Sequence, residues 1–369
     1  MKNYRIFIIN PGSTSTKLSL FENHNELFTT DVFHDSSILL QFETINDQLD
    51  YRMEVIEQFI KDNHIDLEGV DAIVARGGGC CPVEGGIYAV DDLLIADTKA
   101  NKGNCYHSSM LGVQMGKRLH DRYGGLFLMM DPPVVDEFID EARITGVKGI
   151  YRSSICHALN LRAAAMHHAG VLGGKYADYN FIVCHIDGGI SITAHRKGRM
   201  IDGNNASGGQ GPFSPTRMGT MAITDVIDYM FDYSKEEMKV LCSQGGGFSS
   251  HFGTSNSNTI HAMVEQGDPK ATVIWNAMIY QITKEIGQMA CALKGEVDAI
   301  VLTGGLLRFA DIVNGIKEGC EWIAPVVIYP GEFEQKAMAS GALRVLNHEE
   351  ELKTYTGKPV WSGFGFEES

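Results

Sequence analysis

Short apolar runs that end at glycine or proline recur along the chain and predict β-strands. The first run, residues 4–10, stops at Pro11-Gly12, and strand-like alternation resumes after a polar turn. Similar runs predict strands at residues 72–75, 126–130, 181–186, 190–196, 299–302 and 324–329. Apolar positions at helical spacing predict helices at residues 50–63, 108–122, 158–168, 271–294 and 335–346. Strands that alternate with helices predict an α/β protein.

The turn between the first two strands has the composition of a phosphate-binding hairpin. Gly12 allows a ligand to approach the backbone closely. The next residues offer hydroxyl and amide groups that phosphate oxygens can use, namely Ser13, Thr14, Ser15 and Thr16. The Walker A spacing is absent, and a strand rather than a helix follows. An ordinary hairpin with a polar tip accounts for this stretch equally well, so the other motifs must decide.

A second hairpin of the same kind occurs in the middle of the chain. A strand, a glycine turn and a returning strand occupy residues 181–196, around Asp187-Gly188-Gly189. This repeat predicts two domains of similar topology that face one cleft. A further glycine pair, Gly304-Gly305, follows a predicted strand and suits close approach to a nucleotide.

Several charged residues stand where a ligand would bind. Arg76 ends a strand before three glycines, and it is either an anion clamp or a surface arginine beside a flexible turn. Asp131 follows a strand and either serves a metal or catalytic group or starts a plain turn. His157 opens a helix, as a catalytic group or as an ordinary first-turn histidine. Residues 202–220 are too rich in glycine and proline for a helix or strand, and we interpret them as an active-site loop carrying Arg217.

Composition limits the classes of function. The 369 residues suffice for about two domains. With 31 basic and 46 acidic residues the formal net charge is −15, which argues against nucleic acid or anionic membranes held by bulk electrostatics. No apolar run approaches the roughly 20 residues of a membrane helix and no signal-peptide pattern precedes the first strand, so we expect a cytoplasmic protein. The eight cysteines lack metal-binding spacing, and we expect thiols rather than disulfides.

The order of these motifs resembles the acetate and sugar kinase, Hsp70 and actin superfamily. Within it, the pattern is most similar to the butyrate kinases of the acetokinase family. The motifs that carry the resemblance are INPGSTSTK (9–17), ARGGG (75–79), DPPVVDE (131–137), CHALN (156–160), GGISI (188–192), NNA (204–206), GPFSP (211–215), VDAIVLTGGL (297–306) and YPGE (329–332). They span nearly the whole chain.

The resemblance implies an α/β fold of two duplicated ribonuclease H-like domains, of the actin-like ATPase type, around a central cleft. Residues 1–150 with 336–369 would form the acid- and phosphoryl-side domain, and residues 151–335 the nucleotide-binding domain. The implied reaction is butyrate + ATP ⇌ butyryl phosphate + ADP by in-line phosphoryl transfer, with ATP/ADP and Mg²⁺ as cofactors. The family also implies a homodimer or a larger homo-oligomer.

The resemblance also implies roles for individual residues. The catalytic residues would be Arg76 and Arg217, which would hold the carboxylate and phosphoryl oxygens. Asp131 would orient the carboxylate and phosphoryl region or magnesium, and His157 would donate to the phosphoryl group. Asn10 and Glu334 would hold magnesium. Phosphate and nucleotide contacts would come from Asn10, Ser13, Thr14, Ser15, Lys17, Gly188, Gly189, Ser191, Gly304 and Gly305. Acetate kinases carry two histidines near the first-turn position, and this sequence is expected to keep one.

The residues after Arg76 bear on substrate size. Acetate kinases place bulky residues there, whereas Gly77 and Gly78 are expected to leave room for an acyl chain. Each buried methylene contributes roughly 0.8 kcal/mol, so we expect butyrate rather than acetate. Propionate, isobutyrate and isovalerate remain open.

Five positions depart from the butyrate kinase pattern. They are Asp187 for glycine, Gln210 for an acidic residue, Ser207-Gly208 for Leu-Asp, and Met218 for serine. An aspartate facing a polyphosphate repels it unless a cation intervenes. A catalytically weak or silent ATP-binding protein on the same fold therefore stays open. A sugar kinase would need a carboxylate base such as Asp131, but the paired arginines favour a carboxylate acceptor.

Overall fold

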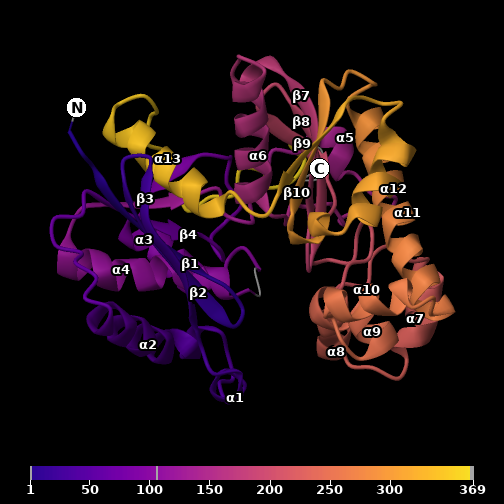
Figure 1. The fold of residues 1–369 in the computed structure, drawn as a ribbon, viewed down its shortest axis with the longest axis horizontal. Coiled ribbons are helices and arrows are strands. Elements are labelled where there is room, and N and C mark those ends of the chain that lie inside the picture. The colour runs from indigo at the N-terminus through magenta and orange to yellow at the C-terminus, as the bar shows by residue number, and fades with distance from the viewer. Residues whose placement is uncertain (1, 105–106, 366–369) are drawn as a thin grey trace. The chain divides into compact units, whose positions relative to one another are not determined.

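The computed structural model describes residues 2–104 and 107–365, and Figure 1 draws its ribbon. The chain divides into two compact units, Met1–Asp136 with Phe333–Ser369 (unit 1) and Glu137–Glu332 (unit 2). These limits lie before the positions 150 and 335 that the sequence led us to expect. The segment after position 136 packs with unit 2 because Ile139 N donates to Ile201 O over 3.1 Å.

Unit 1 is built on a six-stranded sheet with the order β3-β2-β1-β4-β6-β5. The strands are β1 (Arg5–Pro11), β2 (Ser15–Glu22), β3 (Asn25–Phe33), β4 (Ala72–Arg76), β5 (Ile87–Ala89) and β6 (Leu126–Met130). The helices are α1 (Ser36–Leu39), α2 (Leu49–Asp62), α3 (Asp92–Lys99), α4 (Gly112–Tyr123) and α13 (Glu334–Leu346), with 3₁₀ turns at Asn46–Gln48 and Ser108–Leu111. β1 pairs antiparallel with β2, and β1, β4 and β6 run parallel.

Alternating side chains give the sheet of unit 1 two apolar faces. One buried series packs with α2 and α4: Phe7, Ile9, Ile73 and Ala75. The other buried series points to the opposite face: Ile6, Ile8 and Val74. Helix α13 packs on β1, β4 and β6 from that side, away from α2 and α4 (Figure 1). Asn10 and Arg76 continue the second series, so the alternation directs both toward α13.

Unit 2 contains a five-stranded sheet with the order β11-β10-β7-β8-β9. The strands are β7 (Asn180–Ile186), β8 (Ile190–Arg196), β9 (Arg199–Gly203), β10 (Ala299–Gly304) and β11 (Val326–Pro330). The helices are α5 (Asp140–Arg143), α6 (Ala158–Val171), α7 (Ile223–Met230), α8 (Lys235–Val240), α9 (Phe248–Phe252), α10 (Ser257–Glu265), α11 (Pro269–Ala292) and α12 (Ala310–Cys320), with shorter turns at Tyr176–Asp178, Leu241–Gly245 and Gly305–Arg308.

The two sheets repeat one topology. The order β9-β8-β7-β10-β11 corresponds to β3-β2-β1-β4-β6, with the same antiparallel hairpin and the same parallel strands. Residues Ile182, Cys184 and Ile186 of β7 join the core that α11 covers. His185 lies between them in the alternation and points to the other face, on which α6 packs. The predicted duplication is therefore confirmed within the described residues.

The segment after α13 also belongs to unit 1. Tyr355 is buried; its hydroxyl donates to Asp97 Oδ2 over 2.9 Å and accepts from Cys81 N over 3.0 Å. The described cysteines form no disulfide, and Cys105 lies outside the described residues. Among the helices of residues 2–104 and 107–365, none has the length and apolar character needed to cross a membrane.

Candidate active site

Three polar side chains meet at the carboxyl ends of β1 and β4 in unit 1. Asn10 Nδ2 donates to Glu334 Oε2 over 2.7 Å, and Arg76 Nη1 donates to the same oxygen over 3.1 Å. Arg76 Nη1 also lies 3.3 Å from Asn10 Oδ1. Glu334 is 3% exposed and stands in the first turn of α13, where the helix dipole stabilises a negative charge. The structure thus brings together predicted site residues from three distant parts of the sequence.

Strand register explains this meeting. Ile9 pairs with Ala75 across the parallel strands, so Asn10 and Arg76 follow at neighbouring positions on one face. Lys17 pairs with Asn10 across the antiparallel hairpin and points to the same face. Arg76 forms an ion pair and its side chain is 14% exposed, so the alternative of a surface arginine is wrong.

The polar turn after β1 is held by a backbone hydrogen bond, and the residues at its tip are exposed to solvent. Gly12 N donates to Ser15 O over 2.7 Å. Ser13 and Thr14 are exposed, and Ser15 is half-buried. The predicted phosphate-binding hydroxyls therefore lie on the same hairpin as Asn10, at the solvent-facing tip.

Asp131 is buried one strand away from Arg76. It follows Met130, which pairs with Arg76 across β4 and β6. Asp131 Oδ1 accepts from Gly86 N over 2.7 Å, and Asp131 N donates to Gly86 O over 3.1 Å. Its φ of 38° is unusual for a residue with a side chain, which marks a strained position that the surroundings hold in place.

Gly77 and Gly78 do not leave the expected room for an acyl chain. A Cβ on Gly77 would lie 2.3 Å from Met129 Sδ, and a Cβ on Gly78 would lie 2.6 Å from Ser109 Oγ and 2.9 Å from Met110 N. Protein atoms already fill the side-chain position at both glycines. Close packing therefore explains both glycines, and the expectation that they leave room for an acyl chain is wrong, while the preferred acid stays a prediction.

Arg217 lies against the glycine turn of the second hairpin, in unit 2. A Cβ on Gly189 would be 2.2 Å from Arg217 Nη1, so this contact requires glycine. Ser214 Oγ and Thr216 Oγ1 both donate to Gly188 O, over 2.7 Å and 2.9 Å. These bonds fasten the loop that carries Arg217 to the turn.

The guanidinium of Arg217 has hydrogen-bond donors available for an anion. Its Nε and Nη1 are buried and have no hydrogen-bond partner in the described part of the chain. Burial lowers the pKa of Arg217 to about 10, which leaves it charged at neutral pH. A buried cation without a partner is costly, and a carboxylate or phosphate would satisfy it. Beside it, a Cβ on Gly188 would meet nothing within 4 Å, so this side of the turn is open.

Two histidines, rather than the expected one, lie together in unit 2. The rings of His157 and His185 stack with centroids 4.0 Å apart. His157 Nδ1 lies 2.8 Å from Ser191 Oγ, and Ser191 pairs with His185 across the hairpin. Sequence reasoning missed His185 because it stands inside an apolar strand. Its position just before the glycine turn was the available signal.

Neighbouring hydrogen bonds fix the proton of His185. Thr303 Oγ1 donates to Gly331 O over 2.8 Å, so it accepts from Asn160 Nδ2, which lies 3.2 Å away. The other hydrogen of Asn160 Nδ2 is directed at His185 Nδ1, over 2.8 Å. Because Nδ1 accepts, neutral His185 carries its proton on Nε2.

Asp187 holds two glycine turns together. Its Oδ1 accepts from Gly188 N over 2.8 Å, and its Oδ2 accepts from Gly305 N over 2.7 Å. A Cβ on Gly304, whose φ is 112°, would lie 2.3 Å from Ile186 O, and a Cβ on Gly305 would lie 2.6 Å from Asp187 Oδ2. The structure thus brings Gly304 and Gly305 next to the hairpin turn, and packing inside the protein explains why both are glycine.

Known proteins resemble this chain over most of its length. Residues 155–318 match the model of the acetokinase family. Two proteins named "Probable butyrate kinase", from Clostridium botulinum strains Alaska E43 / Type E3 and Eklund 17B / Type B, are each 42% identical over 355 residues, which cover 96% of this chain and 100% of each relative. The chain belongs to the acetokinase family.

Solved structures of other proteins share the fold of this chain. Acetate kinase from Porphyromonas gingivalis has a TM-score of 0.71 at 18% identity, covering 93% of this chain and 100% of its own. A propionate kinase from Francisella tularensis subsp. tularensis SCHU S4 has a TM-score of 0.73 at 16% identity, covering 92% and 98%. These two likenesses support the fold alone, and they confirm the predicted duplicated actin-like ATPase fold. Membership of the acetokinase family confirms the predicted enzyme class, a phosphotransferase with a carboxylate acceptor.

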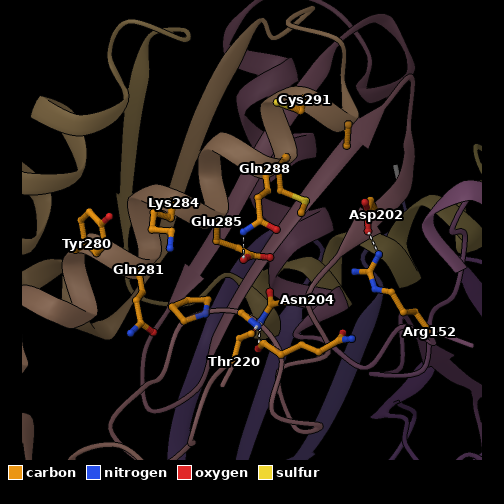
Figure 2. A pocket seen from close by; sticks show the side chains of 15 residues that line it. Arg152, Asp202, Asn204, Thr220, Tyr280, Gln281, Lys284, Glu285, Gln288 and Cys291 are labelled. Atoms are coloured by element: carbon orange, nitrogen blue, oxygen red, sulfur yellow. Dashed lines mark hydrogen bonds and ion pairs between the residues drawn. The ribbon is translucent and has the colours of Figure 1, made fainter. Parts of the chain in front are cut away.

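This acetokinase family member also has a pocket of about 750 Å³ in unit 2, with polar and apolar residues in its lining (Figure 2). One side of α11, the end of β9 and the base of the Arg217 loop line it. Arg152 pairs with Asp202 over 2.9 Å, and Gln288 Nε2 donates to Glu285 Oε2 over 3.1 Å. None of the predicted site residues is among the described residues that line the pocket.

Glu285 makes the stability of this acetokinase family member depend on pH. The residue is 7% exposed, and burial raises its pKa to about 7, although Arg152 opposes the shift. Between about pH 4.5 and pH 7 the folded chain then binds more protons than the unfolded chain, so stability falls as pH rises. Glu285→Gln, which has no charge to bury, is expected to raise the free energy of unfolding at pH 8 by up to about 3 kcal/mol and to have little effect at pH 5.

Denaturant unfolding at both pH values tests this expectation. The control is Glu265→Gln, since Glu265 on the neighbouring helix α10 has a side chain that is 69% exposed. An equal gain at pH 5 and pH 8 for Glu285→Gln would contradict the assignment.

Proposed function

We propose that this member of the acetokinase family transfers the γ-phosphoryl group of ATP to a short-chain carboxylate, with butyrate as the preferred acid. The observation that carries the proposal is Arg217, a charged guanidinium with two buried nitrogens that lack a partner among the described residues. The preference for butyrate rests on the two relatives named "Probable butyrate kinase". Propionate and branched four- and five-carbon acids are the alternative substrates.

The chemistry asks the protein mainly for positioning and charge neutralisation. A carboxylate oxygen attacks the γ-phosphorus, the bond to the β-phosphate oxygen breaks, and ADP leaves with those electrons. A carboxylic acid is already ionised at neutral pH, so no general base is needed. This agrees with Asp131, whose Oδ1 is already engaged by Gly86 N.

The arginines are assigned to the anions. Arg76 Nη1 donates hydrogen bonds to Asn10 Oδ1 and Glu334 Oε2. Its Nε and Nη2 have no partner among the described residues, so they are available to donate to an anionic ligand. Arg217 would hold phosphoryl or carboxylate oxygens with its buried nitrogens. His157, bonded to Ser191 through Nδ1, would donate from Nε2 to a phosphoryl oxygen. In each case the donor stabilises charge that develops during transfer.

Two of the departures from the family pattern, Asp187 and Gln210, have structural explanations that fit an active enzyme. The carboxylate of Asp187 is neutralised in part by two amide donors, rather than left facing a ligand alone. Gln210 Oε1 accepts from Asn205 N over 3.1 Å and fixes the Arg217 loop. Neither residue therefore requires a silent protein.

Magnesium fits oxygen donors in both units. Bound Mg²⁺ would neutralise charge on the β- and γ-phosphates. In unit 1, Asn10 and Glu334 offer oxygens, although Glu334 Oε2 already accepts from Asn10 and Arg76. In unit 2, His185, Asp187 and Glu332 each place one possible ligand atom within 4.8 Å of the others. Because His185 carries its proton on Nε2, the two carboxylates suit the ion better than the imidazole.

Two substitutions distinguish these holders. If unit 1 holds the ion, Glu334→Gln is expected to raise the Mg²⁺ concentration for half-maximal activity about 10-fold or more, and Asp187→Asn much less. Activity titrated with Mg²⁺, alongside Mn²⁺ binding followed by electron paramagnetic resonance, measures this. A larger rise in the Mg²⁺ requirement for Asp187→Asn than for Glu334→Gln would place the proposed magnesium site in unit 2.

A substrate panel tests the proposed function. The purified chain is incubated with ATP, Mg²⁺ and acids from acetate to isovalerate, and acyl phosphate is trapped with hydroxylamine. We expect the highest kcat/KM for butyrate, and ATP from butyryl phosphate and ADP in the reverse direction. A maximum at propionate or isovalerate would change the substrate and keep the reaction. ATP binding without acyl phosphate from any acid would refute the proposed function.

A further inference from the structure

Arg52, on helix α2, is a buried arginine that binds the first hairpin from inside unit 1. It is 1% exposed. Its Nη1 donates to Gly12 O over 3.0 Å, its Nη2 to Ser13 O over 2.6 Å, and its Nε to Gln48 Oε1 over 3.1 Å. The two ends of the guanidinium fork thus hold two consecutive carbonyls of the polar turn.

This arginine has no acidic partner among the described residues. Burial lowers the pKa of Arg52 to about 10. Nearby His34 has a pKa lowered to about 4, by burial first and by the charge of Arg52 second. Burying an uncompensated charge lowers the stability of the folded chain. An apolar residue at position 52 would avoid this cost, but it would leave the carbonyls of Gly12 and Ser13 without the donors of Arg52.

The two bonds to carbonyls determine where the next amides point. In the trans peptides of this turn, each C=O and the following N–H point in opposite directions. Since the carbonyls of Gly12 and Ser13 face Arg52, the amides of Ser13 and Thr14 face away from it. Both residues are exposed, and neither amide has a hydrogen-bond partner among the described residues. Consecutive outward amides of this kind form an anion-binding surface.

The other side of the turn is held by β3 and the residue after it. His34 N donates to Thr14 O over 2.9 Å, and His34 Nε2 lies 2.8 Å from Thr16 Oγ1. The carbonyl of Thr14 is thereby fixed as well. Each carbonyl from Gly12 to Ser15 accepts a hydrogen bond from another group of the protein. The amides of Ser13 and Thr14 therefore remain as donors for a ligand.

We propose that Arg52 is a positioning residue for phosphoryl transfer: by binding the carbonyls of Gly12 and Ser13 it turns the amides of Ser13 and Thr14 outward to receive phosphate oxygens. This inference rests on the proposed function for its kinetic consequence. The structural part of the inference, that Arg52 orients the amides of Ser13 and Thr14, can be tested without catalytic activity. Arg52 touches neither substrate nor nucleotide and acts through the turn.

The kinetic test compares Arg52→Gln and Arg52→Lys with a matched control. Arg5 also binds two backbone carbonyls with one fork, since its Nη1 donates to Glu68 O and its Nη2 to Asp66 O, both over 2.6 Å, but it lies at the opposite end of β1. Misplacing a binding group by about 1 Å costs roughly 100-fold, so we expect kcat/KM for ATP to fall about 100-fold in Arg52→Gln. Arg52→Lys keeps the charge without the fork and should lose about 10-fold, whereas Arg5→Gln should stay within about 3-fold.

A second readout separates this inference from the proposed function. Backbone amide resonances of Ser13 and Thr14 are followed by NMR while the full chain is titrated with ATP and Mg²⁺. We expect both to shift in the unmodified chain and in Arg5→Gln, and to respond weakly in Arg52→Lys, which serves if Arg52→Gln does not fold. A chain that makes no acyl phosphate but shows this pattern would refute the proposed function and keep the inference. Equal shifts with and without Arg52, no shift in the unmodified chain, or full turnover in both Arg52 variants would overturn it.

Discussion

Replacing Arg217 by methionine is expected to lower kcat about 1,000-fold, because it removes several donors to charge that develops in the transition state. The guanidinium carries two buried nitrogens that lack partners among the described residues, so little in the protein competes for them. The substitution is not expected to lower the free energy of unfolding, since it removes a cation that burial disfavours. Steady-state kinetics and denaturant unfolding of the same preparation measure both quantities.

Two further variants make the Arg217 experiment specific. Gly189→Ala places a Cβ 2.2 Å from Arg217 Nη1, so it should displace the guanidinium and lower kcat about 100-fold with the arginine still present. Arg199→Met changes an exposed arginine of β9 and should leave kcat unchanged. If Arg217→Met lost stability in proportion to its lost activity, the residue would be a structural one.

Replacing Arg76 by methionine is expected to cost both stability and activity. Arg76 and Glu334 form an ion pair of 3.1 Å, with side chains that are 14% and 4% exposed. Removing the arginine leaves a buried carboxylate without its cation, which typically costs about 3–5 kcal/mol. Urea unfolding of Arg76→Met beside the unmodified chain measures the loss of stability, and steady-state kinetics measures the loss of activity.

The double variant Arg76→Met/Glu334→Gln separates the two effects. With no carboxylate left to neutralise, most of the lost stability should return, while the turnover lost in the single variant should not. Arg118→Met removes an arginine paired with Asp50 at the surface and should cost less than about 1 kcal/mol. A double variant as unstable as Arg76→Met would show that packing, rather than the uncompensated charge, causes the loss.

The residues that sequence reasoning located share one property. The strands around Asn10, Arg76 and Gly304 are short and mostly apolar, and turn residues follow them, so local pattern alone indicates where they end. In parallel sheets those ends hold ligands, and this carried the candidate site. Strand β3 escaped prediction because most of its residues are at least partly exposed and its apolar residues are few.

Other features depend on contacts between distant segments. Arg52 stands on an amphipathic helix about 40 positions after the turn that it holds, and nothing in its neighbours marks the contact. His185 looked like one more residue of a buried strand. The prediction that Gly77 leaves room for an acyl chain was wrong because a single sequence does not distinguish a glycine required by packing from one required by a ligand.

Unit 1 draws its strands from the beginning of the chain and helix α13 from near its end. On the ribosome, therefore, the sheet face of Ile6, Ile8 and Val74 has to wait for roughly 260 further residues after Val74 before its covering helix begins. The continuous segment of unit 2 is complete earlier and can fold while that face is still uncovered. The Asn10–Arg76–Glu334 cluster then forms as one of the last steps of biogenesis, so an interrupted nascent chain carries an exposed apolar sheet that chaperones would need to shield.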